Sequence, residues 1–278
     1  MERGEKEMTQ VETAKDAMND ETYLKALKDI LYQLADDDFL ISFRGSEWLG
    51  LAPHIEEDVA FSSITQNTMG HALMYYTLLE ELGEGEADVL AHERGPSERK
   101  NAIYFEKKNG EGDYLTEPYY DWALAVVRNF LYESFKKVKL EVLTKSSYTP
   151  LANVSGKVLM EQPYHLAHWR IWFNQLYNST EHAKARLEER LEEAWGQFSD
   201  VLELGPHATE LEHFGIIVGE DELKERFLKE IESTIGTFPE KPLAKNLGSG
   251  REGEYTEDLN QALKTLSEVY RSDEKAVW

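Results

Sequence analysis

The sequence predicts an all-α fold, a four-helix bundle with additional C-terminal helices. Only 8 prolines and 18 glycines occur in 278 residues, and they cluster. The long stretches between these clusters carry apolar residues at intervals of three and four, as one buried face of a helix requires. The sequence has neither alternating strand and helix units nor a glycine-rich nucleotide-binding motif, which argues against Rossmann and P-loop folds.

The first two long helices are expected over residues 21–48 and 54–82. Apolar residues recur through the first one every three or four positions. The second begins with three acids, which favour the positive end of the helix dipole, and it ends before Gly83, a residue type that favours helix C-termini. Residues 1–20 precede this pattern, so we expect a flexible N-terminal tail and a single domain over residues 21–278.

The other two long helices are expected over residues 117–145 and 149–177, after one longer crossover. Pro118 and Pro150 fall in their first turns, where a missing N–H costs no hydrogen bond. Pro163 lies in the middle of the fourth helix and should kink it. The remaining expected elements are one short strand at 103–106 and helices at 180–202, 220–235 and 256–271.

Composition and charge exclude several classes of protein. Acidic residues number 53 and basic residues 30, and the resulting charge of −23 repels nucleic-acid phosphates and anionic membranes. No run of about 18 apolar residues is present, so we expect no membrane span. The charged N-terminus does not look like a secretory signal, and a cytoplasmic protein is expected. Because the chain has no cysteine, it has no disulfide and no thiolate metal site.

Long four-helix bundles can hold two metal ions between a carboxylate on each of two helices and a Glu-x-x-His pair on each of the others. This sequence has a related pattern with two substitutions. His71 and His165 each follow a neutral residue at i−3, where glutamate is expected, and each follows a carboxylate by nearly the same number of residues. The four matching positions are Asp38, His71, Glu133 and His165, with Thr68 and Gln162 in place of the glutamates. We interpret these as vestigial metal positions, and we predict no catalytic and no cofactor-binding residues.

Other uses of these residues stay open from sequence alone. Asp38 ends a run of three aspartates that could form a solvated face, and Glu133 could pair with Lys136 or Lys137. Glu161 is next to Gln162 but about 100° round a continuous helix, so it should not replace it. The two remaining carboxylates offset little of the charge of two divalent ions. We therefore expect no metal or other cofactor on this chain.

An aromatic stretch at residues 164–173 follows His165 on the predicted fourth helix. His165, His168, Trp169 and Trp172 share one helical face. Such a face suits a cofactor box, core packing or contact with another subunit, and tryptophan and arginine are enriched at interfaces. Core packing or contact with another subunit is the favoured interpretation.

Several segments resemble the C subunit of the phenylacetyl-CoA epoxidase complex, a phenylacetic acid catabolic protein of ferritin-like fold. Gln66–Ala72 reads QNTMGHA and is similar to the family's Q-D-E-L-G-H-A. The other matching segments are SEWLGLAP at 46–53, EEDVA at 56–60, EQPYHLAH at 161–168 and GREGEYTE at 250–257, followed by Arg271 and Trp278. The resemblance extends over residues 36–278, and the tail before residue 21 has no matching counterpart.

The resemblance implies a ferritin-like subunit of a multicomponent monooxygenase that epoxidises the ring of phenylacetyl-CoA. In that family a homologous A subunit holds the di-iron site, a reductase completes the system, and the C subunit is a non-catalytic structural partner. The departures agree with this role, because Thr68 and Gln162 stand where many relatives have glutamate. Asn67 for aspartate, Tyr255 for histidine and the presence of Pro163 mark a divergent member.

Three interpretations follow from the sequence. The first is a non-catalytic subunit that binds and stabilises a catalytic di-iron homologue, and that forms a homodimer when isolated. The second is a divergent di-metal oxygenase that uses the four remaining ligands. The third is a stand-alone homodimeric helical protein with no oxygenase partner.

Overall fold

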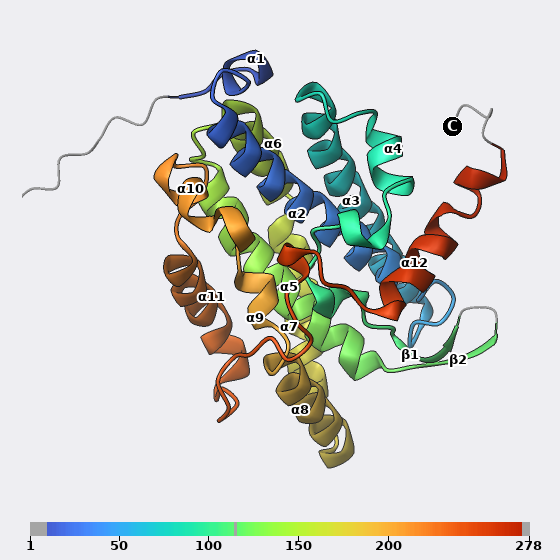
Figure 1. Ribbon diagram of the computed structural model, residues 1–278. Coiled ribbons are helices and arrows are strands. Elements are labelled where there is room, and N and C mark those ends of the chain that lie inside the picture. The colour runs from blue at the N-terminus through green and yellow to red at the C-terminus, as the bar shows by residue number, and fades with distance from the viewer. Residues whose placement is uncertain (1–9, 114–115, 274–278) are drawn as a thin grey trace, which may run out of the picture.

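The computed structural model describes residues 10–113 and 116–273 and confirms the all-α, ferritin-like four-helix bundle (Figure 1). Helix α2 packs against α3, and α5 packs against both α6 and α7. A contact between α3 and α6 joins the two pairs. The bundle helices are α2 (Glu21–Ser46), α3 (Ile55–Glu81), α5 (Trp122–Leu143), α6 (Thr149–Leu159) and α7 (Gln162–Tyr177).

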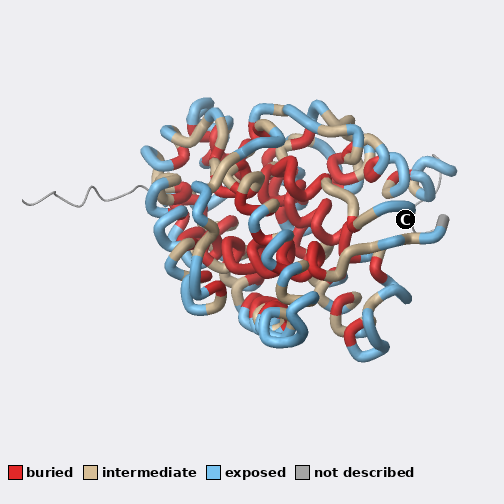
Figure 2. Tube along the Cα trace, turned by 90° about the horizontal axis from the view of Figure 1, so that it is seen from below, coloured by how far each residue is buried: buried red, intermediate tan, exposed pale blue. Residues whose placement is uncertain are grey.

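Helix α5 lies at the centre of the molecule. Nearly all its residues are buried, on every side of the helix, because it contacts α6, α7, α8 (Glu181–Trp195) and α11 (Glu220–Ile235). Figure 2 shows the buried chain gathered in the middle and exposed segments around it. A helix that is covered all round has no solvent face, so its charged side chains must find partners inside the protein.

The predicted start of the third helix, at residue 117, is wrong. Residues around Pro118 form strand β2 (Thr116–Tyr120), which pairs antiparallel with β1 (Gly110–Asp113) in a small hairpin. Asp121 then caps α5, because its carboxylate accepts hydrogen bonds from the backbone N–H groups of the first turn. Pro118 therefore belongs to a short strand rather than to a first helical turn.

The strand predicted at 103–106 is also wrong, because these residues form a 3₁₀ helix, η2 (Ile103–Glu106). Buried carboxylates accept hydrogen bonds from the backbone N–H groups at its N-terminal end. Asp37 accepts from Ala102 N at 2.9 Å, and Asp200 accepts from Ile103 N at 2.8 Å. These contacts satisfy the N–H groups that a neighbouring strand would otherwise have to pair.

The fourth long helix is broken, as Pro163 predicts. Helix α6 ends at Leu159 and α7 begins at Gln162, with Pro163 in its first turn. Proline lacks the N–H that would continue the helical hydrogen bonds and clashes with the preceding turn. Met160 and Glu161 form the junction, where the backbone N–H groups bond to the carbonyl three residues back instead of four.

Shorter elements surround the bundle. Residues 10–20, assigned to the tail from sequence, include a one-turn helix and a bridge from Val11 to Tyr148. Within the described residues, no helix is both long and apolar enough to span a bilayer. The remaining elements are α1 (Ala14–Ala17), α4 (Ala87–His92), η1 (Pro96–Glu98), α9 (Ser199–Leu202), η3 (Gly205–His207), α10 (Ala208–His213), η4 (Gly250–Glu252), α12 (Glu257–Ser267) and η5 (Tyr270–Ser272).

Candidate functional site

The three successive aspartates of α2 are all buried, so the interpretation of a solvated acidic face is wrong. Successive residues of a helix point about 100° apart, so each carboxylate reaches a different part of the core. Each one meets its own basic partner there. The pairs are Asp36 with Arg94 and Arg99, Asp37 with Arg251 and Lys139, and Asp38 with Lys136. Burial of the acidic run is thus matched by buried cations, as the cost of desolvation requires.

Arg251 belongs to the GREGEYTE segment near the C-terminus, and its side chain binds Asp37 on α2. Its guanidinium donates two hydrogen bonds to Asp37, at 2.9 and 2.7 Å, and its side chain is completely buried. A bidentate arginine–carboxylate pair fixes both position and orientation. The C-terminal segment is therefore anchored in the core of the domain.

Lys136 is the central side chain of the candidate site. Lys136 belongs to α5. Its ammonium nitrogen lies 2.6 Å from Asp38 Oδ1 on α2 and 3.0 Å from His71 Nδ1 on α3. The Tyr132 hydroxyl donates to the same oxygen of Asp38. Burial raises the pKa of the Asp38 carboxyl, and the charge and hydrogen bond of Lys136 oppose that rise. One buried cation thus joins three helices of the bundle.

His71 is held as a neutral imidazole. An ammonium group can only donate, so Nδ1 accepts from Lys136 and Nε2 carries the ring proton. That Nε2 lies 2.9 Å from a carboxylate oxygen of Glu161. Burial and the adjacent Lys136 charge lower the pKa of His71 to about 2. Both ring nitrogens already have partners, which leaves neither one available to a ligand.

Glu161 reaches the site, contrary to the expectation from a continuous helix. The break before Pro163 places it at the junction between α6 and α7, where the angular spacing of one helix does not apply. Its side chain is 49% exposed, so the His71–Glu161 contact links the buried cluster to the surface. Pro163 predicts the break from sequence, but it does not show which way the Glu161 side chain points.

The second half of the candidate site is arranged around Glu133. The Gln162 side-chain amide donates to the Glu133 carboxylate, and also to the Glu133 backbone oxygen at 2.9 Å. His165 Nδ1 lies 3.6 Å from Glu133, and His165 Nε2 lies 3.4 Å from the amide of Asn67. Although burial raises the pKa of Glu133, its contact with His165, the nearby charge of Lys136 and the hydrogen bond from Gln162 lower it below the ordinary value.

The structure places all four vestigial positions in the interior. Asp38 and His71 are not bonded directly, since Lys136 lies between them. The direct pairing of Glu133 with a neighbouring lysine is wrong, because Lys137 binds Glu230 on α11 at 2.7 Å and Lys136 binds Asp38. Lys136 lies three residues after Glu133, so both side chains are on the same face of α5. This spacing is the feature of the sequence from which Lys136 could have been assigned to the site.

These residues do not fit a di-iron centre. Lys136 engages Asp38 and His71, Gln162 offers an N–H donor to Glu133, and Thr68 donates its hydroxyl to Ile64 O on its own helix at 2.9 Å. Iron ligands must instead direct lone pairs at the metal. Among the described residues, no group of three or more His, Cys, Asp or Glu side chains is arranged to hold a metal ion.

The aromatic face of α7 packs into the core. Trp169 is completely buried and stacks edge-on against Phe61, with ring centroids 4.8 Å apart. Glu57 on α3 accepts hydrogen bonds from His168 at 3.0 Å and from the Trp172 indole at 2.5 Å. A buried carboxylate thus satisfies the ring nitrogens of His168 and Trp172, and core packing accounts for this face of α7.

Comparison with known proteins agrees with this architecture. The family model described as "Phenylacetic acid catabolic protein" matches residues 8–278. A curated relative, the C subunit of the 1,2-phenylacetyl-CoA epoxidase of Escherichia coli (strain K12), is 26% identical over 245 residues, which cover 86% of this chain and 94% of the relative. With a match over nearly its whole length, this chain belongs to the phenylacetic acid catabolic protein family.

Proposed function

We propose that this chain is a structural, non-catalytic subunit of a phenylacetyl-CoA ring epoxidase, a multicomponent monooxygenase of aerobic phenylacetate catabolism in the cytoplasm. Its partners are a homologous catalytic subunit that holds the di-iron site and the reductase of the complex. The similarity to the C subunit of such an epoxidase, over most of both chains, supports the assignment to a complex of this kind.

The position of Lys136 carries the non-catalytic part of the proposal. Its ammonium group stabilises Asp38 and His71 by direct contact, as a metal ion in that place would. Unlike a metal ion, an ammonium group can only donate hydrogen bonds and cannot bind dioxygen. Activation of dioxygen at iron needs open positions beside the protein ligands. In this proposal the charged cluster stabilises the bundle, and the partner subunit supplies the chemistry.

Reconstitution with the homologous di-iron subunit tests the proposal. The two purified chains should co-elute on size-exclusion chromatography at micromolar concentration, and ring epoxidation should fall when this chain is omitted. His71→Gln should leave the turnover of the assembled complex unchanged, because His71 takes no part in oxygen chemistry. If the complex assembles but the variant loses most of its activity, the divergent oxygenase interpretation replaces this one.

The absence of co-elution, together with epoxidation that does not depend on this chain, would instead favour the stand-alone homodimer. In the proposal, self-association of the isolated chain is the weaker process and uses the apolar surface that the partner covers in the complex. A dimer that persists when the homologous subunit is present in excess would contradict it.

A further inference from the structure

The outer face of α3 carries no charge along most of its length. Residues 59–79 contain no Asp, Glu, Lys or Arg, although charged residues make up 30% of the chain. Val59, Gln66 and Leu73 are exposed and follow one another at seven-residue intervals, which keeps them on a single stripe. An uncharged stripe of this kind is unusual on the surface of a strongly acidic protein.

The same face continues onto α6 and α7, which lie beside α3. The contacts of His71 with Glu161 and of Glu57 with His168 fix this adjacency. Exposure ranges from 50% at Leu73 to 78% at Tyr164. The large apolar side chains of this outer face, which we call the α3–α7 face, are Ile55, Val59, Leu73, Met160, Tyr164 and Ile171.

Small residues leave room on this face for a second helix to approach closely. Ser63 and Gly70 lie beside the apolar stripe at the same seven-residue spacing. A Cβ atom added to Gly70 would meet nothing within 4 Å. Several large exposed apolar side chains gathered on one face mark an interaction site, and the small residues among them suit a helix.

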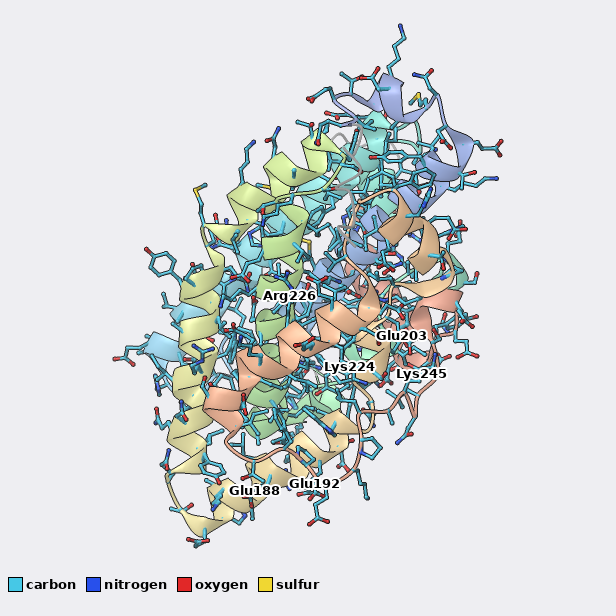
Figure 3. All side chains as sticks on the ribbon, turned by 90° about the vertical axis from the view of Figure 1, so that its left-hand side faces the viewer. Glu188, Glu192, Glu203, Lys224, Arg226 and Lys245 are labelled. Atoms are coloured by element: carbon cyan, nitrogen blue, oxygen red, sulfur yellow. The ribbon has the colours of Figure 1, made fainter. Side chains whose placement is uncertain are left out.

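The side of the molecule with α8 and α11 is different. Figure 3 shows charged side chains projecting there, among them Glu188 and Glu192 of α8 and Arg226 of α11. Arg226 pairs with Glu222 one turn away. Those side chains interact with water and with one another, so that side does not need a partner to cover it.

Charges at the ends of the α3–α7 face select the occupant. Glu56 is exposed at the N-terminal end of α3 and Glu81 at its C-terminal end. Pairing of α3 with its copy would bring Glu56 against Glu56 in a parallel arrangement and against Glu81 in an antiparallel one. Glu161 adds a third acid near the middle, where Lys157 on α6 is an exposed base. Self-pairing is therefore opposed by like charges at the ends.

We infer that the α3–α7 face docks a different subunit of the complex, through a helix that is uncharged at its centre and basic at both ends. The inference rests on the proposed function, since that supplies a partner, and it adds the surface and the chemistry by which the partner is recognised. In such an interface the buried apolar centre contributes most of the binding affinity. The acidic rim favours a partner with basic residues and disfavours an acidic one.

Variants of exposed residues test this without disturbing the fold. The probe is the purified homologous di-iron subunit, with affinity measured by calorimetry. Leu73→Lys should weaken binding by roughly tenfold or more, as expected for a central apolar contact. Val59→Lys should weaken binding more than Val59→Glu, because a basic partner rim repels the lysine. Val269→Lys changes an exposed apolar residue between α12 and η5, outside the α3–α7 face, and is the matched control that should bind like the wild type.

Gly70→Gln adds a test that separates docking from stability. Glutamine favours a helix over glycine, so the variant should be at least as stable as the wild type. Its longer side chain should still weaken binding, because it prevents the close approach of a helix.

The outcomes separate the two proposals. If the wild type does not bind the probe at all, the proposed function fails and the docking inference fails with it. If the wild type binds and the Leu73, Val59 and Gly70 variants bind equally well, the proposed function stands and the α3–α7 face is not the interface. A wild-type homodimer that these variants dissociate, and that an excess of the probe does not displace, would show that the occupant is a second copy, which also contradicts the inference.

Discussion

Lys136 Nζ lies 2.6 Å from Asp38 Oδ1, and both side chains are almost completely buried. The bond joins α5 to α2 at the centre of the bundle, and the contact of Lys136 with His71 adds α3. A protein-borne cation at this position satisfies the carboxylate and the imidazole without metal. That arrangement, with the other buried pairs, determines how the protein should respond to substitution and to pH.

Lys136→Met should lower the free energy of unfolding by about 3–5 kcal/mol at neutral pH, because it leaves the Asp38 charge buried without its partner. The loss should shrink at acidic pH, where Asp38 becomes protonated. Denaturant unfolding at pH 7 and pH 5 measures both effects. Lys137→Met is the matched control: its pair with Glu230 is partly exposed and should contribute less than about 1 kcal/mol. Equal losses in the two variants would disprove the role of the buried pair.

Rebuilding the metal site should require removal of Lys136. Thr68→Glu with Gln162→Glu restores two carboxylates, but the ammonium group still engages Asp38 and His71. We expect little iron in this double variant and more in the triple variant that also carries Lys136→Ala, although the break at Pro163 should keep binding incomplete. Iron titration followed by absorption spectroscopy compares them. Equal and tight binding by both variants would show that Lys136 does not block the site.

His71 should make the protein less stable in acid. Its pKa is about 2 in the folded state, against an ordinary value of 6.5, so below pH 6.5 the unfolded chain binds a proton that the folded chain does not. The contribution is complete above pH 6.5 and is lost as the pH falls below it, by about 1.4 kcal/mol per pH unit. The difference in unfolding free energy between wild type and His71→Gln should shrink accordingly from pH 7 to pH 5. Replacement of the exposed His182 by Gln should leave the slope unchanged, and a parallel shift in both variants would contradict this account.

Arg251→Met should destabilise the domain by about 3 kcal/mol or more, since it leaves the buried Asp37 carboxylate with the backbone N–H of Ala102 and the more distant charge of Lys139. Arg226→Met removes an exposed pair with Glu222 and should cost less than about 1 kcal/mol. Thermal and denaturant unfolding of the two variants give the comparison. A small effect at Arg251 would mean that the C-terminal segment is not anchored through this pair.

The bundle was predictable because long helices leave a clear apolar periodicity, and α2 and α3 begin and end close to the expected residues. The sequence places the third helix too early, because proline suits the start of an edge strand as well as a first helical turn. The segment around Ile103 is apolar over a few residues, and its true conformation depends on Asp37 and Asp200, which lie far away in sequence.

The candidate site was predictable only in part, for a similar reason. The repeated spacing between carboxylate and histidine predicts Asp38, His71, Glu133 and His165 as site positions, and all four side chains lie inside the bundle. Spacing could not show that Lys136 would bind Asp38 rather than Glu133, since that depends on how two distant helices rotate against each other. Glu161 reaches His71 only because the chain breaks next to it.

Iron content tests the central claim most directly. The protein is purified without chelators from cells grown with added iron, and iron per chain is measured by mass spectrometry. Because Lys136, Gln162 and Thr68 fill the positions that a metal pair would need, we predict far less than one iron per chain. About two tightly held irons per chain, the content of a di-iron centre, would contradict the account and support an oxygenase site on this subunit.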